Sequence, residues 1–137
     1  MKELSAVFQD LQNRIAAVIP AAHIAVNADS AAAANDVRTI RTDSLPSVVI
    51  SLDRIGYEEG NLVRVISLTL FLTDRFSADS ASRASSALTL CETIQSLFPP
   101  EGVLLDGALC LPGELIPEAP DSESLCCRWR FGLTVKQ

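Results

Sequence analysis

Residues 62–73 read LVRVISLTLFLT, and this stretch predicts the central strand of a sheet. Successive side chains of a strand point to opposite faces, so its residues separate by parity. One face is apolar except for Arg64, and the other is half polar. The apolar face contains Leu62, Ile66, Leu68, Leu70 and Leu72, and the half-polar face contains Val63, Val65, Ser67, Thr69, Phe71 and Thr73. We therefore expect a strand with one face in the core.

A second strand precedes it at residues 47–56, SVVISLDRIG, where Val48, Ile50 and Leu52 again lie on one side. The connection at residues 57–61, YEEGN, contains a glycine and an asparagine, which tolerate positive φ. The two strands are therefore predicted to form a hairpin.

The C-terminal residues 125–136, LCCRWRFGLTVK, predict another long strand. Its apolar face contains Leu125, Cys127, Trp129, Phe131, Leu133 and Val135, and its other face contains Cys126, Arg128, Arg130, Gly132, Thr134 and Lys136. We expect the first face to be buried and the second to meet solvent or a partner.

Apolar residues at helical spacing predict amphipathic helices over residues 2–18 and 84–98, each ending before a proline. Residues 103–111 predict the remaining strand. The expected fold is α+β in the order α-β-β-α-β-β. It has long hairpins, a mainly antiparallel four-stranded sheet, and both helices packed on one face.

The composition predicts a single domain over residues 1–137, because 48% hydrophobic content is enough for one core. The formal net charge of −6 argues against nucleic-acid binding, which needs clustered Lys and Arg. The sequence shows no basic and apolar signal segment and no apolar stretch of about 18 residues. We expect a cytoplasmic protein that does not enter the membrane.

The four cysteines do not predict a metal centre. No C-x-x-C pair is present, and the adjacent Cys126 and Cys127 point to opposite faces of a strand. We expect Cys91, Cys110 and Cys127 to be small core residues in a reducing compartment, and Cys126 to be a surface or interface thiol.

No catalytic, cofactor or metal site is predicted. His23 is the only histidine, and we interpret it as an ordinary loop residue. Asp53, Glu58 and Glu59 are typical of a solvated turn rather than of a catalytic carboxylate pair. The sequence contains no nucleophile elbow, no glycine-rich phosphate loop and no His-x-x-x-His pair. We therefore expect a protein that is not an enzyme.

Two segments are predicted as loops. Residues 20–44 are rich in Ala, Asn, Asp and Ser and lack a strong period, although residues 37–40 could add a short strand. A loop longer than about 12 to 15 residues is usually functional or disordered. Residues 112–123 contain three prolines and four acids, which predicts a stiff negative connection, either solvated or in contact with a partner.

The predicted strands at 62–73 and 125–136 are longer than the usual 3 to 10 residues. Each could extend roughly 40 Å, more than a core of this size can cover. We therefore expect the outer sheet face or the strand edges to pair with another copy of the chain.

The order of these elements resembles the small tail terminators of tailed bacteriophages, in the Mu-like prophage group. The resemblance covers an N-terminal helix, a long loop, a hairpin ending in LTLFLTDR, a Ser/Ala-rich helix closing on LFPPEG, and the final strand CCRWRFGLTVKQ. It implies a structural protein that forms a ring, expected to be a hexamer, on the tail tube. The ring would end tube polymerisation and present the surface that joins the head.

The resemblance implies no enzyme and no cofactor. The implied partners are other copies of the chain, the tail tube protein and a head-completion or neck protein, with assembly in the host bacterial cytoplasm and a final place in the virion tail. Subunit contacts are expected from charged residues of the hairpin, the last strand and the loops. The candidates are Glu58, Glu59, Arg64, Arg128, Arg130, Glu114, Glu118 and Asp121.

Two other functions fit the sequence. One is a different head-to-tail joining protein with a similar fold. The other is a small ligand-binding or enzymatic α+β domain that uses residues 20–44 as a lid over a pocket.

Overall fold

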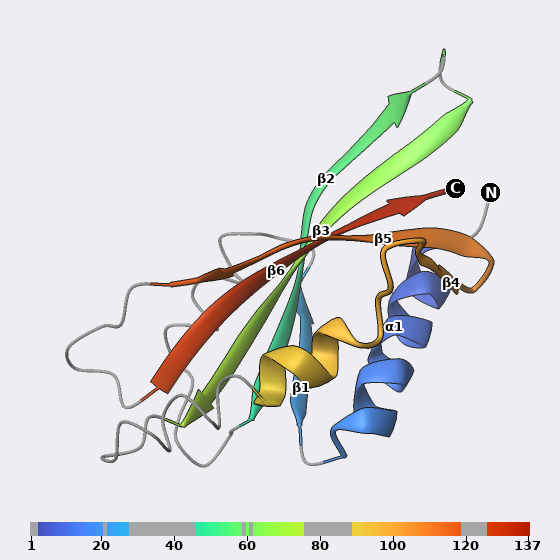
Figure 1. Ribbon diagram of the computed structural model, residues 1–137. Coiled ribbons are helices and arrows are strands. Elements are labelled where there is room, and N and C mark those ends of the chain that lie inside the picture. Colours follow the sequence, from blue (N-terminus) through green and yellow to red (C-terminus); the bar gives the residue numbers. More distant parts are fainter. Residues whose placement is uncertain are drawn as a thin grey trace.

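The protein folds into one six-stranded sheet with two helices (Figure 1). The structure, a computed structural model, describes residues 3–20, 22–27, 46–58, 60, 62–75, 89–118 and 126–137. The elements are α1 (Leu4–Val18), β1 (His23–Asn27), β2 (Ser47–Glu58), β3 (Val63–Arg75), a second helix over 89–95, β4 (Val103–Leu105), β5 (Ala108–Pro117) and β6 (Cys126–Lys136). The strand order is β1-β2-β3-β6-β5-β4, in which only the β1–β2 pair is parallel.

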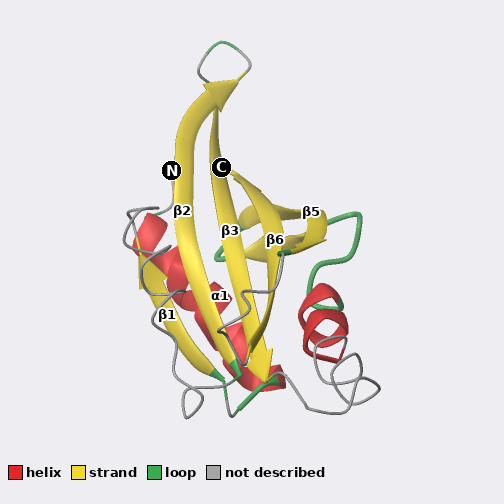
Figure 2. Ribbon diagram, turned by 90° about the vertical axis from the view of Figure 1, so that its left-hand side faces the viewer, coloured by secondary structure: helices red, strands yellow, loops and turns green. Residues whose placement is uncertain are grey.

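Both helices pack on the same face of the sheet (Figure 2). Val7, Leu11 and Ile15 of α1 share one buried cluster with Leu90 and Ile94 of the second helix and with the inward side chains of the strands. The α+β class, the mainly antiparallel sheet and the one-sided helices are therefore confirmed. The predicted helix over 2–18 is observed from Leu4, and the part of the predicted helix before residue 89 lies outside the described residues.

No helix in the described ranges is both long and apolar enough to cross a membrane.

The prediction of four strands was wrong, and one extra strand is β1. Its five residues lie in the segment predicted as a loop over 20–44 and pair in parallel with Ser47–Ser51. A five-residue edge strand with only Ile24 and Val26 as large apolar residues gives little period to detect. Residues 28–45, which include the possible strand at 37–40, lie outside the described residues.

The other extra strand arises because the stretch predicted as one strand over 103–111 turns back at Asp106 and Gly107. Both residues have positive φ, 48° and 83°, and they form a two-residue hairpin loop between the paired Leu105 and Ala108. β5 then continues to Pro117, into the segment predicted as a loop over 112–123. The prolines are accommodated because β4 pairs only with the first three residues of β5, so the later outer edge needs no donor from the described strands.

A bulge divides β2 into two halves. Leu52 is paired with Leu68 and Arg54 with Ser67, which leaves Asp53 as the extra residue. Before the bulge Val48 and Ile50 face the helices, and after it Ile55 lies opposite Ile66 on the same side. The bulge therefore keeps apolar residues of both halves on one face.

The predicted parity of the central strands is confirmed for most residues. Ile66, Leu68, Leu70 and Leu72 of β3 are buried, as are Phe131, Leu133 and Val135 of β6. Leu62 was wrongly predicted as a core residue: it precedes β3 and is 81% exposed. Trp129 and Cys127 are half-buried, and Leu125 lies outside the described residues.

α1 is fastened to the turn between β4 and β5 by polar contacts. The Asp10 carboxylate accepts a hydrogen bond of 2.7 Å from the backbone N–H of Asp106 and pairs with Arg14 Nε at 3.1 Å. Arg14 Nη2 in turn donates to the carbonyl of Leu104 at 2.8 Å. Partial burial raises the pKa of Asp10, but the Asp106 N–H and the Arg14 guanidinium outweigh it, and the pKa lies below its usual value.

We expect Asp10→Asn to destabilise the protein at pH 7 by about 1 kcal/mol. The neutral amide is a weaker acceptor than the carboxylate for the Asp106 N–H and for Arg14. A carboxyl whose pKa is lowered by folding stabilises the native state above its unfolded pKa, and this contribution is lost as the pH falls through its folded pKa. The difference from wild type should therefore become smaller as the pH falls. Urea unfolding followed by the single tryptophan at pH 7 and at pH 3 tests this. An equal difference at both pH values would contradict it.

Candidate assembly surfaces

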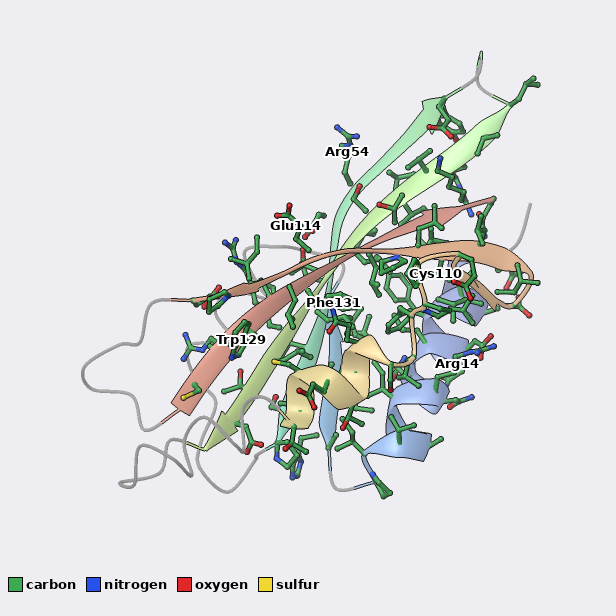
Figure 3. The ribbon with its side chains drawn as sticks, viewed as in Figure 1. Arg14, Arg54, Cys110, Glu114, Trp129 and Phe131 are labelled. Atoms are coloured by element: carbon green, nitrogen blue, oxygen red, sulfur yellow. The ribbon has the colours of Figure 1, made fainter. Side chains whose placement is uncertain are left out.

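The sheet has an outer face that neither described helix covers (Figure 3). Phe131 and Cys110 point toward the helices, whereas Arg54 of β2 and Glu114 of β5 project from the outer face. Register places Ser67 beside Thr134 and Thr69 beside Gly132 in the middle of this face. The outer face therefore has small polar residues at its centre, with Val49 and Phe71 next to them and charged residues further out.

A hydrogen-bonded cluster joins β2 and β3 on the outer face. The hydroxyls of Ser51 and Thr69 both donate to the carboxylate of Asp53, the first at 3.1 Å. Asp53 can reach both because it is the extra residue of the bulge. The Asp53 carboxylate, predicted as part of a solvated turn, is instead a structural acceptor within the strand.

Further along the same face, three strands bring together a polar row. Ser47 of β2 is opposite Thr73 of β3, and Thr73 is opposite Arg128 of β6. Ser47 and Thr73 are buried, with 5% and 0% exposure. Within the described part of the chain, Thr73 Oγ1 and Arg128 Nε are buried and have no hydrogen-bond partner. Each such group costs about 1 to 3 kcal/mol of desolvation.

Several of the charged residues predicted for subunit contacts are paired inside the subunit. Arg130 Nε lies 3.4 Å from a Glu118 carboxylate oxygen, and Lys136 Nζ lies 2.9 Å from Glu58. Arg64 hydrogen-bonds to Gln137 through both backbone and side chain, which extends the β3–β6 pairing by one residue. The Arg130 and Arg64 contacts join neighbouring strands, whereas the Lys136–Glu58 pair crosses β3 and joins β6 to β2. All of them stabilise the sheet of one subunit.

The remaining candidates have different environments. Glu114 is exposed, and it belongs to the register shift between Pro112 and Leu115 in β5. Glu59 and Asp121 lie outside the described residues. The predicted inter-subunit role of all eight charged residues stays a prediction.

An apolar surface that the sequence analysis did not single out lies at the end of the β2–β3 hairpin. We call residues 54–58 and 62–65 the arm, whose tip projects beyond the end of β6 in Figures 1 and 2. Ile55, Tyr57 and Leu62 on the arm are 45%, 57% and 81% exposed. Ile55 and Tyr57 are odd-numbered and therefore out of phase with the even-numbered core residues of β2, because the bulge shifts the alternation. The uninterrupted alternation of β2 therefore does not reveal this surface.

Residues with potential chemistry are scattered. His23 is exposed and belongs to β1 rather than to the predicted loop; its backbone N–H donates to the carbonyl of Pro46 at 2.9 Å. Among the described residues, no three His, Cys, Asp or Glu side chains come together as a metal site. Cys91 and Cys110 are buried, as predicted, and Cys127 is half-buried, while the Cys126 side chain is outside the described set.

No protein-family model and no curated protein sequence matches this chain. The fold is similar to that of a solved chain from the virion of a native gene transfer agent particle, with a TM-score of 0.52 and 11% sequence identity. The similarity covers 96% of this chain and 91% of the virion chain. At this identity the similarity shows a shared fold.

We expect Thr73→Val to stabilise the protein by about 1 kcal/mol, because valine has the same shape and removes a buried hydroxyl that lacks a described partner. The measurement is the urea midpoint at constant slope, followed by Trp129 fluorescence. A lower midpoint would mean that the hydroxyl has a stabilising partner.

The matched substitution Thr69→Val on the same strand should have the opposite sign. It removes the hydroxyl that donates to Asp53, and we expect a loss of about 1 kcal/mol. Equal effects of the two variants would show that the hydroxyl contacts are not what distinguishes them.

Burial raises the pKa of the Cys91 thiol to about 11, with help from Glu92, and burial raises that of Cys110 to about 12 against the influence of Arg14. At pH 8 roughly one thiol in a thousand, or fewer, is then the reactive thiolate. We expect both residues to resist maleimide in the native protein and to react in urea, as mapped by mass spectrometry. Rapid native labelling of either would contradict this burial.

Proposed function

We propose that this protein is a structural component of a phage-like virion that closes into a ring on the end of a tail tube. The ring ends tube polymerisation and presents the surface to which the head is joined. In this proposal the ring is a hexamer, as the sequence resemblance implies, and the protein is not an enzyme.

The observation that supports the proposal most is the fold similarity to a gene transfer agent virion chain, which extends over nearly the full length of both chains. A match of this extent involves the whole arrangement of helices and strands and not a common local motif. At 11% identity the similarity by itself shows a shared fold, and a role in a virion is our proposal.

The shape of the subunit also favours assembly. β2 and β3 have 12 and 13 residues, beyond the usual strand length, and their far end forms the arm with its exposed apolar residues. Monomeric proteins seldom keep a contiguous apolar patch in water, and such patches commonly mark contact surfaces.

The proposed partners are other copies of the chain, the tube protein and a head-completion or neck protein. A ring requires a heterologous contact, in which one surface of each subunit meets a different surface of the next. The proposed place of assembly is the bacterial cytoplasm, and the final location is the virion tail. The proposal includes no cofactor and no specific nucleic-acid contact, in line with the net charge of −6.

Two measurements on the full chain test the proposal. Light scattering at increasing concentration and negative-stain imaging should reveal rings of defined subunit number. When the protein is added to tube protein during polymerisation, we expect shorter tubes with a ring at one end.

Monomers throughout, together with tube growth that the protein does not alter, would reject the proposal. Rings that bind purified heads but leave tube growth unchanged would instead support the alternative of a different head-to-tail joining protein. Bovine serum albumin at equal mass serves as the control for non-specific effects on tube growth.

A further inference from the structure

Two polar groups on the outer face of the sheet are buried without a hydrogen-bond partner in the part of the chain that the structure describes. They are Thr73 Oγ1 on β3 and Arg128 Nε on β6, and the two residues stand opposite each other in the strand register. Opposite residues on one face of an antiparallel pair have Cβ atoms about 4.5 to 5.5 Å apart. A single small ligand group can therefore contact both side chains.

Both groups can act as donors to such a ligand. The guanidinium of arginine has only N–H donors and no acceptor, and the threonine hydroxyl can donate its hydrogen. The two side chains do not bond to each other, although Arg128 Nε–H could donate to the Thr73 hydroxyl. A group with two acceptor oxygens would satisfy both of them.

Arg128 also lacks a counter-charge, because no ion pair of the described residues includes it. The backbone N–H of Glu118 donates to the Arg128 carbonyl at 3.0 Å, yet the Glu118 carboxylate pairs with Arg130 at 3.4 Å. Asp74 follows Thr73 in the sequence, but it faces the helix side of the sheet, where it lines a hollow between the helices. A partly buried positive charge without a partner is costly, and a water molecule would not neutralise it.

We propose that Arg128 and Thr73 form a binding site for an oxyanion, which is a carboxylate or a phosphate group. Arg128 supplies the positive charge and a planar set of N–H donors that matches two oxygens of such a group. Thr73 supplies an O–H donor from the adjacent strand. Ser47 of β2, which is 5% exposed and lies opposite Thr73, extends the row of hydroxyl groups beside the site.

Two sources can supply the oxyanion. One is a free inorganic ion such as phosphate, and in that case the site is a property of the monomer. The other is a carboxylate side chain of a neighbouring copy, which the sequence offers in excess with 17 acidic and 11 basic residues. In that case the site rests on the proposed function and deepens it, because a charge pair between copies fixes how they are oriented.

The test compares wild type with Arg128→Met, which removes the guanidinium and keeps an unbranched side chain. The matched control is Arg54→Met, which removes the same charge from an exposed position on the same face (Figure 3). Circular dichroism should show that both variants fold. In chloride buffer, at concentrations where sedimentation shows monomers, we expect Arg128→Met to be at least as stable as wild type, because it removes an unpaired buried group.

Inorganic phosphate is the probe for the site itself. Replacing chloride by phosphate at equal ionic strength should raise the urea midpoint of wild type and of Arg54→Met by more than that of Arg128→Met. A ligand that binds only the native state stabilises that state, whereas Arg128→Met measures the general effect of phosphate on folded proteins. The expected advantage of Thr73→Val over wild type should shrink in phosphate, because the wild-type hydroxyl then gains its acceptor.

Sedimentation at higher concentration distinguishes the two sources. If a carboxylate of a neighbouring copy occupies the site, Arg128→Met should lose the assembly that wild type and Arg54→Met retain, and phosphate should compete with assembly. If a free ion occupies the site, all three proteins should assemble alike, while the effect of phosphate on the midpoint still depends on Arg128.

An equal effect of phosphate on all three proteins, together with equal assembly, would overturn the proposal, because the two groups then bind water alone. A lower midpoint of monomeric Arg128→Met in chloride would also overturn it, since the guanidinium would then have a partner in its own chain. Failure of the proposed function is a separate result. A phosphate effect that depends on Arg128 in a protein that forms no rings would retain the site and reject the ring.

Discussion

The backbone pairing of β3 with β2 on one side and β6 on the other is the constraint on which the rest of the structure depends. β3 is hydrogen-bonded to β2 from Val63 to Thr73 and to β6 from Val65 to Arg75. Because strand side chains alternate with a period of two, this double register decides which side chains of three strands meet the helices. Leu68, Leu70 and Leu72 form the floor on which α1 and the second helix pack, and a slip of one residue would replace them by Ser67, Thr69 and Phe71.

Sequence patterns correctly predicted the elements that have one face in the common core. The β2–β3 hairpin, β6 and α1 have long alternating or helical apolar periods, and these survive in the structure because each has one face in a common core. The patterns failed for short segments, where a turn or a proline determines the structure and the apolar period is too short to detect. β1 is too short to show a period, and Asp106–Gly107 is a hairpin signal inside a stretch that is otherwise apolar at every position. Pro112 and Pro117 suggested a loop, but β5 tolerates them because no described strand pairs with its outer edge beyond Cys110 and because its register shifts.

The contact surfaces were harder to predict than the fold, and for a different physical reason. Charged residues such as Arg130 and Glu58 suggested subunit contacts, yet whether a charge is satisfied within its own subunit depends on cross-strand neighbours that sequence does not specify. The sequence predicts Tyr57 as a turn residue and Leu62 as a core residue. In the tertiary structure both are exposed, because no described residue covers them. Exposure is a property of the whole fold, so the exposed state of these residues is seen only in three dimensions.

The bulge at Asp53 has a consequence for how the two ends of the subunit can vary. In the body of β2 the even-numbered Val48, Ile50 and Leu52 face the helices, whereas beyond the bulge the odd-numbered Ile55 and Tyr57 occupy that side. Because Asp53 is an extra residue, the side chains beyond it alternate out of step with those of the core half of β2. Residues beyond the bulge can therefore be substituted without changing the alternation of apolar and polar residues in the half of β2 that packs in the core. A chain organised in this way can keep one scaffold while its contacts with neighbours diverge, which is compatible with a fold shared at only 11% identity.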